Sequence, residues 1–466
     1  MKTLKRLLTI ILMIAIAALA ASCGMAESTD YPIGVGGDGY APARDGVPSG
    51  MAGEVGGKTY EVAGECYEGM EPDSPTGETT DDSVDDTEEH EEQIIRPAGL
   101  ITASAWNDNQ YYNYFLSMFE KGETTEQNDG SVTTTESGKF YNRLVGDNWG
   151  FDATHRVKIT VTSEQSPVVG ATVKYYGANQ SERYAVTDAN GVAYIFPDGE
   201  SGTFTVASGI YSQTGAFDKE NTDVKVELTN FTAKDNVIKL MFVVDVTGSM
   251  GDEMSYLSNE LNDVINRVVA ANPNVRIDLA YLFYRDDGDN EKFAYFDFLT
   301  VTENYKNFSA QLKNLSVQRA DGGGDYPEAL DEALELAVNK DWGEENSTRI
   351  IFHVYDAPPH TTAKNKTTYE NAVRTAAKKG IRINPVLCSG ADELCEYIAR
   401  QAAIHTAGHF VYVTDDSGIG NSHYDPNLPN AVVERLNDLM IRLINGYHSG
   451  EFAAAVDWRQ AVKEQQ

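Results

Sequence analysis

The chain has 466 residues, with 71 acidic and 37 basic side chains and a formal net charge of −34. This length exceeds what one hydrophobic core normally organises and predicts two or three domains. The acidic excess excludes a long-range field that attracts nucleic acid and favours a surface that attracts cations.

The N-terminus carries the pattern of an export signal. Lys2, Lys5 and Arg6 precede an apolar run at 7–21, which ends at Ser22 and Cys23. The stretch 19–23 resembles a bacterial lipobox, which implies that residues 1–23 are a lipoprotein signal peptide and that Cys23 is lipidated. The alternative is an ordinary secretory signal. Either interpretation predicts that the mature protein leaves the cytoplasm, and the lipobox resemblance implies a lipid-anchored protein of the bacterial cell envelope, periplasmic or surface-exposed. Since no second apolar run reaches about 18 residues, lipid is the only membrane attachment expected.

Residues 24–97 are rich in Gly, Pro, Ser, Thr, Asp and Glu, with an acidic run at 81–92. Such a composition buries too little apolar surface to offset the entropy of ordering, so we predict a disordered, self-repelling tether. A loose match to a nucleotide-binding loop at 52–59 lacks the strand and helix that such a loop joins. We therefore interpret it as part of the tether.

Residues 98–150 form a short aromatic-rich segment, expected to fold as a short helix packed on the domains after it in the chain. Residues 151–235 alternate apolar and polar side chains at 157–162, 171–176 and 202–207, with turn residues at 188–191. This pattern predicts a small antiparallel β-sandwich. The stretches 167–173 and 187–193 resemble the carboxypeptidase-regulatory or transthyretin-like family, which implies a spacer or binding module.

From residue 236 to 448, apolar runs typical of buried strands alternate with helical periodicity. Strands are predicted at 237–244, 275–284, 350–355, 381–387 and 410–413. Helices are predicted around 254–268 and at 305–315, 327–338, 369–379, 392–403 and 431–444, before a C-terminal tail at 449–466. This order predicts an α/β fold with a doubly wound, Rossmann-like sheet, whose ligands bind beyond the carboxyl ends of the strands.

Polar clusters fall on that edge of the predicted sheet. Residues 245–249 (Asp-Val-Thr-Gly-Ser) end the first strand, 322–328 (Gly-Gly-Gly-Asp-Tyr-Pro-Glu) precede a helix, and 356–360 (Asp-Ala-Pro-Pro-His) end another strand. The glycines permit close backbone approach, and Pro327 suits a first helical turn. Oxygen ligands of this kind suit a hard divalent cation.

Together with 284–286 (Tyr-Arg-Asp), these stretches resemble the von Willebrand factor A (vWA) domain and its metal-ion-dependent adhesion site, in particular a hemicentin-like subset. The resemblance implies that Thr247 and Ser249 ligate the ion, and that Asp245 and Asp356 act directly or through water. Integrin-type domains usually carry Thr where this chain has Asp325, so a third carboxylate is expected. Mg²⁺ is the expected ion, with Ca²⁺ or Mn²⁺ as alternatives; a vestigial site held by hydrogen bonds alone is the other interpretation.

The remaining polar motifs suggest no enzyme. We interpret 285–290 as a hairpin turn and most of His353, His360, His405 and His409 as structural, because their spacing fits no metal site. No zincin motif or nucleophile elbow is present. Cys388 and Cys395 form either a disulfide or two buried thiols. The predicted function is binding of a protein or glycan at the envelope; the alternative is a non-catalytic subunit that recruits or regulates an enzyme or assembly complex.

Overall fold

The computed structural model of the protein describes residues 53–55, 58–60, 98–126, 132–177 and 181–460, all within one compact unit, Gly50–Gln466. The predicted signal peptide with Cys23, and nearly all of the predicted tether, lie outside the described residues. Among the described residues, no helix is long and apolar enough to cross a membrane.

The larger sheet has eight strands in the order β16-β15-β14-β17-β18-β19-β3-β20. Its five middle strands run parallel, while β16 on one side and β3 with β20 on the other pair antiparallel. The bounds are β3 Thr102–Trp106, β14 Val237–Asp245, β15 Arg276–Tyr284, β16 Phe293–Thr300, β17 Thr348–Tyr355, β18 Ile381–Leu387, β19 Phe410–Val413 and β20 Glu434–Arg435. The predicted α/β class is confirmed.

The central strand β14 shows why this sequence forms a sheet covered on both faces. All nine of its residues are buried. Side chains of successive residues point to opposite faces, so Leu240 and Phe242 enter one hydrophobic core while Met241 and Val243 enter the other. Lys239, which interrupts the apolar run, is buried against Asp278 (3.6 Å) and Glu345 (3.4 Å). The strand therefore fixes the sheet in the middle of two helical layers.

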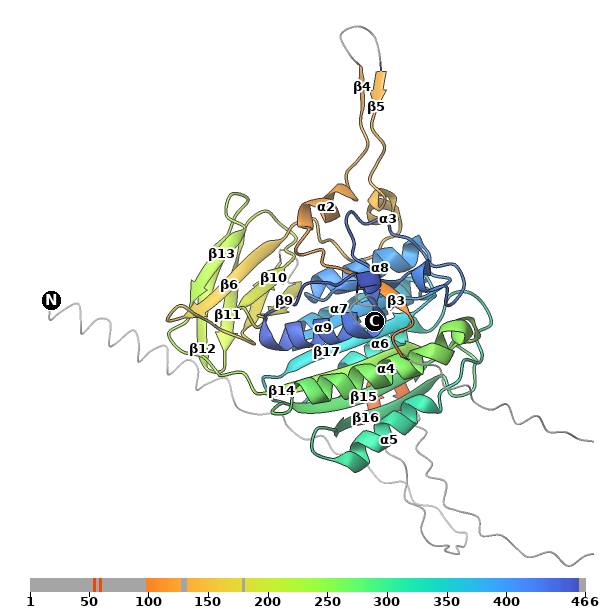
Figure 1. Ribbon diagram of the computed structural model, residues 1–466. Helices are drawn as coiled ribbons and strands as arrows, with labels where there is room; N and C mark the ends of the chain where they lie inside the picture. The colour runs from red at the N-terminus through yellow and green to blue at the C-terminus, as the bar shows by residue number, and fades with distance from the viewer. Residues whose placement is uncertain (1–52, 56–57, 61–97, 127–131, 178–180, 461–466) are drawn as a thin grey trace, which may run out of the picture. The chain divides into compact units, whose positions relative to one another are not determined.

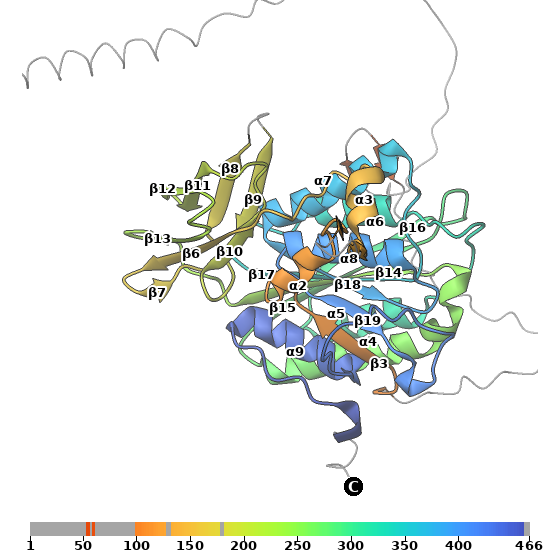
Figure 2. The ribbon, with the colours of Figure 1, turned by 90° about the horizontal axis from the view of Figure 1, so that it is seen from above.

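Helices cover both faces of this sheet, as the two views in Figure 1 and Figure 2 show. One layer holds α4 (Gly251–Ala271), α5 (Tyr305–Ser316) and α9 (Leu436–Ser449). The opposite layer holds α6 (Leu330–Asn339), α7 (Ala363–Lys379) and α8 (Glu393–His405). Short 3₁₀ turns lie at η1 (Gly248–Met250) and η2 (Asp415–Ser417). Because the middle strands are parallel, their carboxyl ends and the loops after them share one edge.

The aromatic-rich segment, residues 98–150, forms strands as well as the helical structure that the sequence predicted. It supplies β3, which pairs with β19 inside the large sheet. It also supplies α2 (Tyr112–Ser117), α3 (Tyr141–Gly146) and the hairpin of β4 (Thr124–Glu126) and β5 (Val132–Thr134), which stands away from the sheet in Figure 1. Phe115, Phe119 and Phe140 pack into the core shared with α8.

A second region lies between β3 and β14 in the chain. It consists of two small sheets, ordered β10-β6-β13 with β7 beside β6, and β12-β11-β8-β9. The pairings are antiparallel except for β13 with β6. The bounds are β6 Val157–Ser163, β7 Ser166–Pro167, β8 Thr172–Tyr176, β9 Glu182–Val186, β10 Val192–Ile195, β11 Gly202–Ser208, β12 Tyr211–Phe217 and β13 Asp223–Glu227. Farther toward the N-terminus, β1 (Gly53–Val55) pairs with β2 (Lys58–Tyr60).

The alternation predicted for β6 is realised, since its residues are buried at every second position and share a separate core with the facing strands. The predicted turn at 188–191 is closed by Asp188, whose Oδ1 accepts from the backbone N–H groups of Asn190 and Val192, each at 2.9 Å. Resemblance of this region to the carboxypeptidase-regulatory family stays a prediction.

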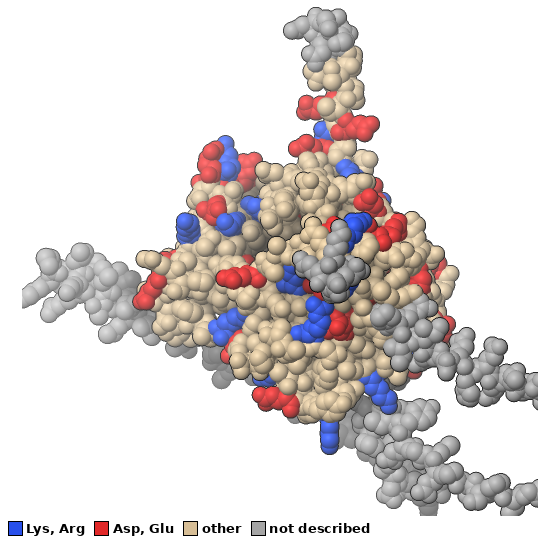
Figure 3. All heavy atoms as spheres, viewed as in Figure 1, with Lys and Arg blue, Asp and Glu red and all other residues tan. Residues whose placement is uncertain are grey.

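Charged side chains of both signs lie on the face seen in Figure 3. Acidic and basic residues are interspersed there, so no single acidic patch covers that face. Cys388 and Cys395 are buried free thiols, which settles their pairing against a disulfide.

Candidate metal centre

The first loop at the carboxyl edge brings Asp245, Thr247 and Ser249 together. Asp245, the last residue of β14, is 0% exposed. Its Oδ1 accepts hydrogen bonds from the backbone N–H (2.9 Å) and hydroxyl (2.7 Å) of Thr247, and the Thr247 hydroxyl lies 3.2 Å from that of Ser249. Asp245 Oδ2 has no hydrogen-bond partner among the described residues. Ser249 is exposed, so this loop presents oxygen atoms from the buried strand end outward.

Asp356, immediately after β17, adds a second buried carboxylate. It is 2% exposed, and its Oδ1 also has no partner among the described residues. Burial, followed by repulsion from Asp356, raises the pKa of Asp245 to about 7. Burial raises the pKa of Asp356 to about 6, although the nearby Ser249 hydroxyl offsets part of the rise. Two neighbouring carboxylates therefore share a site where ionisation is costly without a cation.

The glycine loop, residues 322–324, forms one wall of the site. Gly322 and Gly323 have positive φ, +79° and +76°, and the Gly322 carbonyl accepts from the Gly248 N–H at 3.0 Å. A Cβ on Gly323 would lie 2.9 Å from Glu328 Oε1 and 3.2 Å from the Thr247 Cβ. Only glycine combines this backbone conformation with such close approach. The loop, Ser249 and Glu328 line a pocket of about 160 Å³, enough room for an ion with bound waters.

Glu328 is a third buried carboxylate at this edge, and sequence reasoning did not single it out. It is 3% exposed, and its Oε2 has no partner among the described residues. Burial raises its pKa to about 9, helped by the charges of Asp245 and Asp286. The signal available in the sequence was its position in the Gly-Gly-Gly-Asp-Tyr-Pro-Glu stretch, three residues after Asp325.

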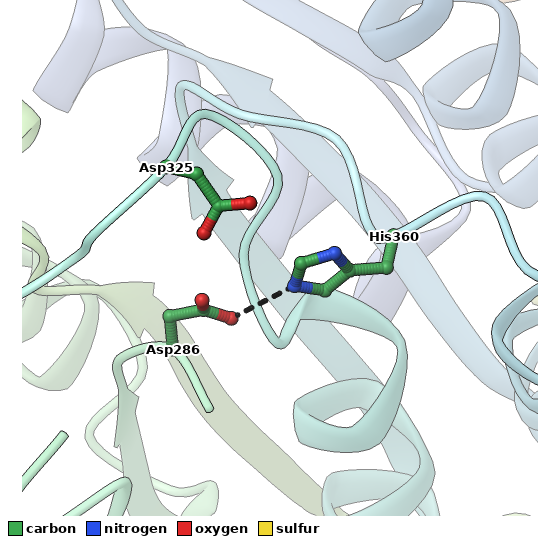
Figure 4. Close-up of side chains that lie close together, drawn as sticks. All are labelled: Asp286, Asp325 and His360. Atoms are coloured by element: carbon green, nitrogen blue, oxygen red, sulfur yellow. Dashed lines mark hydrogen bonds and ion pairs between the residues drawn. The ribbon is translucent and has the colours of Figure 1, made fainter. Parts of the chain in front are cut away.

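Asp325 is exposed and forms a distinct group with Asp286 and His360 (Figure 4). One ligand atom from each of the three residues lies within 4.8 Å of the other two, and His360 Nε2 is 3.2 Å from Asp286 Oδ1. Among the described residues, this is the one group of three candidate His, Cys, Asp or Glu ligands at such spacing. Asp245 and Asp356 are not part of it.

The structure therefore brings four of the five predicted ligands together and places the fifth, Asp325, in a different group. Asp245, Thr247, Ser249 and Asp356 come together at the ends of β14 and β17, whereas Asp325 lies across the pocket with Asp286 and His360. The interpretation of 285–290 as a turn omitted Asp286 from the site, and His360 was grouped with structural histidines. Both residues come after predicted strand ends, which was the available signal.

The other three histidines differ from His360. Burial lowers the pKa of each of His353, His405 and His409 to about 3, so each is neutral at physiological pH. None of them belongs to the group of candidate ligands in the described part of the chain.

Hydrogen bonds between the loops hold the two ligand groups in place. Asp289 Oδ2 accepts from the N–H groups of Asp286 (3.1 Å) and Gly323 (2.8 Å), which ties the 285–290 turn to the glycine loop. The Glu328 N–H donates to the Pro358 carbonyl at 3.0 Å, which ties the glycine loop to the loop after β17. These hydrogen bonds connect the loops that follow β15 and β17 with the glycine loop.

The donor set fits a divalent cation. Three buried carboxylate oxygens, on Asp245, Asp356 and Glu328, lack partners in the described structure, and no Lys or Arg among the described residues forms an ion pair with these carboxylates. An unpaired buried charge is unfavourable by several kcal/mol unless a counter-ion or proton neutralises it. A divalent cation bound at this edge would supply that charge.

Comparison with known proteins identifies the large α/β region. Residues 239–418 match the family model described as the von Willebrand factor A domain. The chain therefore contains a vWA domain, and domains of this family are generally protein-interaction modules that often bind divalent cations.

Two curated relatives share only this part. The alpha-protein kinase vwkA of Dictyostelium discoideum is 27% identical over 146 residues, 31% of this chain and 22% of the relative. The putative ariadne-like RING finger protein R811 of Acanthamoeba polyphaga mimivirus is 30% identical over 139 residues, 30% of this chain and 13% of the relative. This chain thus spans less than a quarter of either relative.

Among solved structures, a von Willebrand factor type A protein from Catenulispora acidiphila is 11% identical, covers 53% of this chain and 46% of its own, and has a TM-score of 0.29. An aerotolerance-related membrane protein from Bacteroides fragilis is 17% identical, covers 49% and 96%, and has a TM-score of 0.24.

Proposed function

We propose that the protein is a cell-envelope lipoprotein whose vWA domain binds Mg²⁺ and, through that ion, a protein or glycan partner, without catalysing a reaction. Asp245, Thr247, Ser249 and Asp356 hold the ion directly or through water, and Asp325 faces it from the pocket wall. Ca²⁺ or Mn²⁺ would suit the same oxygen ligands.

One observation carries the proposal: three buried carboxylates meet at the carboxyl edge, and no Lys or Arg in the described part of the chain pairs with them. Burying ionised carboxylates without a counter-charge is destabilising, and a bound divalent cation supplies that counter-charge. Ser249 is exposed beside these carboxylates and gives a bound ion an outward coordination position.

The partner's binding group is constrained by the local charge. Besides Glu328, whose raised pKa favours its neutral form, the carboxylates of Asp245, Asp286, Asp325 and Asp356 lie at this edge, and together they offset more than the charge of one divalent ion. A partner carboxylate is therefore attracted less than in sites with fewer acidic residues. Neutral oxygen donors, such as glycan hydroxyls or backbone carbonyls, fit this edge better.

Retention experiments test the metal dependence. The purified full chain is immobilised and exposed to envelope extract with Mg²⁺ or with chelator. We expect a specific protein or glycan to be retained only with Mg²⁺, and we expect Ser249→Ala to lose it. Ser255→Ala, an exposed serine one turn along α4, is the matched control and should retain the partner. Equal retention with chelator and in Ser249→Ala would contradict a metal-dependent interaction.

The identity of the retained material separates this function from its alternative. Retention of an envelope enzyme or assembly complex, rather than a surface ligand, would favour a non-catalytic subunit that recruits or regulates it.

Anchoring is tested separately, because Cys23 lies outside the described residues. The Cys23→Ser variant should leave the membrane fraction, since acyl chains would be the strong attachment. Ser22→Ala preserves the cysteine and should remain bound. Membrane retention of Cys23→Ser in high salt would disprove lipid anchoring.

A further inference from the structure

Asp286, Asp325 and His360 differ chemically from the oxygen-only ligands of the first loop. Asp286 follows β15, Asp325 precedes α6 and His360 follows β17, so the group gathers three loops (Figure 4). Asp286 is 4% exposed, while His360 is half-buried and Asp325 is exposed. The group therefore reaches from the protein interior to solvent.

The basic side chains near this group are occupied elsewhere. Arg285 donates to the backbone carbonyls of Asp321, Glu291 and Arg319. Lys292 forms ion pairs with Asp287 and with Glu332 (2.8 Å). Neither neutralises Asp286 or Asp325.

A further buried carboxylate connects this group with the first loop. Glu328 carries an oxygen without a partner in the described structure, and among the charges acting on it Asp245 comes first and Asp286 second. Asp245 belongs to the first loop and Asp286 to the group of Figure 4, so the Glu328 carboxylate is repelled by charges from both groups. A single divalent ion at the first loop offsets the charges of Asp245 and Asp356 and leaves those of Asp286 and Asp325 without a metal counter-charge.

The geometry points to a second metal site formed by Asp286, Asp325 and His360, which takes a divalent transition metal such as Zn²⁺ beside the Mg²⁺ site. An imidazole nitrogen favours metals of the zinc class over Mg²⁺ or Ca²⁺, which prefer oxygen. The site goes beyond the proposed function, because the first ion needs neither Asp286 nor His360.

The loops need little movement to close on a metal. Zinc bonds to nitrogen and carboxylate oxygen of about 2.0–2.2 Å place tetrahedral ligands roughly 3.3–3.6 Å apart. The ligand atoms already lie within 4.8 Å of one another. The exposed Asp325 can rotate to shorten this spacing, whereas Asp286 and the glycine loop are both held by Asp289. Three protein ligands leave a fourth position for water or for a partner side chain.

Titration with Zn²⁺ in the presence of saturating Mg²⁺ tests the site on the purified full chain. We expect the wild type to bind one Zn²⁺ and, in a parallel experiment, to give the visible absorption of a nitrogen-ligated Co²⁺ ion. His360→Ala and Asp286→Asn should each weaken Zn²⁺ binding at least tenfold and leave the Mg²⁺-dependent rise in melting temperature intact. Ser249→Ala should do the reverse.

Controls separate this site from adventitious zinc binding and from misfolding. His155→Ala removes an exposed histidine in the β-sandwich region, and Asp287→Asn removes an exposed neighbour of Asp286; both should bind Zn²⁺ as the wild type does. His360→Asn keeps a polar side chain on the loop and should fold normally yet lose the Co²⁺ spectrum. Unchanged Zn²⁺ affinity in His360→Ala, or loss of both metals in Ser249→Ala alone, would overturn the second site.

Discussion

Among the buried acidic residues that the structure describes, two groups differ in how their charge is neutralised. The first, the Arg400 cluster, comprises Arg400, Asp108 and Glu396. Arg400 Nε donates to Asp108 Oδ2 at 3.1 Å and Nη1 to Glu396 Oε1 at 3.0 Å, and all three side chains are almost completely buried. The second, the edge carboxylates, comprises Asp245, Glu328 and Asp356, which no Lys or Arg among the described residues pairs with.

The difference distinguishes a structural role from a binding role. The Arg400 cluster contains its own cation and joins β3's loop to α8, so it contributes to a folded state without help from solution. The edge carboxylates lack a cation, and burial raises their pKa values to about 7, 9 and 6 for Asp245, Glu328 and Asp356. Shifted titration of this kind at a strand edge is typical of functional sites. Substitutions in the two groups should therefore change the stability of the metal-free protein by different amounts and in opposite directions.

Removing the internal cation should have the largest effect. Arg400→Met keeps the apolar stem but leaves Asp108 buried without its cationic partner beside Glu396, which keeps its ion pair with Lys139, so we expect the free energy of unfolding to fall by about 3–5 kcal/mol. Urea denaturation without metal measures it. Arg267→Met, which breaks half-exposed pairs with Asp263 and Asp438, is the control and should change stability by less than about 1 kcal/mol. Similar small losses in both variants would show that the Arg400 cluster is not structural.

Removing a carboxylate at the edge should have the opposite sign. Asp245→Asn keeps an oxygen for the Thr247 N–H and hydroxyl but removes a charge that repels Asp356. We expect the metal-free variant at pH 8 to be more stable than the wild type by on the order of 2 kcal/mol. It should also lose the Mg²⁺-dependent rise in melting temperature seen in the wild type. Destabilisation of Asp245→Asn without metal, with no Mg²⁺ effect in either protein, would favour the vestigial interpretation.

The pH dependence of the wild type should follow from the same charge. The pKa of Asp245 is about 7 when folded and about 3.8 for the unperturbed side chain. Between these values the folded state binds more protons than the unfolded state, so stability falls as pH rises. We expect the metal-free protein to lose on the order of 1 kcal/mol between pH 6 and pH 8. Saturating Mg²⁺ should stabilise more at pH 8 than at pH 6; equal stabilisation at both would contradict cation binding to this carboxylate.

Periodicity in the sequence predicted the parallel centre of the large sheet but not all of its strands. Apolar runs identified β14, β15, β17, β18 and β19, because a parallel strand covered on both faces excludes polar residues. It missed β16, whose residues are half-buried except for the exposed Asp297. It also missed β3, because β3 pairs with β19 more than 300 residues later in the chain, with Trp106 opposite Phe410. Pairing between such distant segments is decided by tertiary contacts that local patterns do not record.

The candidate site could also be predicted only in part, because the positions of some of its residues depend on tertiary structure. Asp245 and Asp356 follow apolar strands directly, so their meeting at one edge follows from topology alone. The position of Asp325 depends on the path of a flexible glycine loop, and backbone freedom at Gly322 and Gly323 makes that path unpredictable from residue types. Glu328 was missed because it lies just before α6, where an acidic residue ordinarily stabilises the N-terminus of a helix.

The smallest change in metal-free stability is expected for Asp325→Thr. This substitution tests the exposed Asp325 separately from the buried edge carboxylates. Asp325 is exposed, so its replacement should alter the free energy of unfolding without metal by no more than about 0.5 kcal/mol. Loss of one negative charge should nevertheless weaken Mg²⁺ binding about tenfold, and a bound ion should then attract a partner carboxylate more strongly.

Calorimetric titration with Mg²⁺ measures that affinity, and binding of acetate to the Mg²⁺-loaded protein measures the second effect. Glu303→Thr removes the same charge from an exposed residue beyond the end of the antiparallel strand β16, hence from the opposite edge of the sheet, and should leave both measurements unchanged. If Asp325→Thr binds Mg²⁺ as tightly as the wild type, Asp325 does not face the first ion. In that case its carboxylate acts only with Asp286 and His360, and Zn²⁺ affinity should still fall in the same variant.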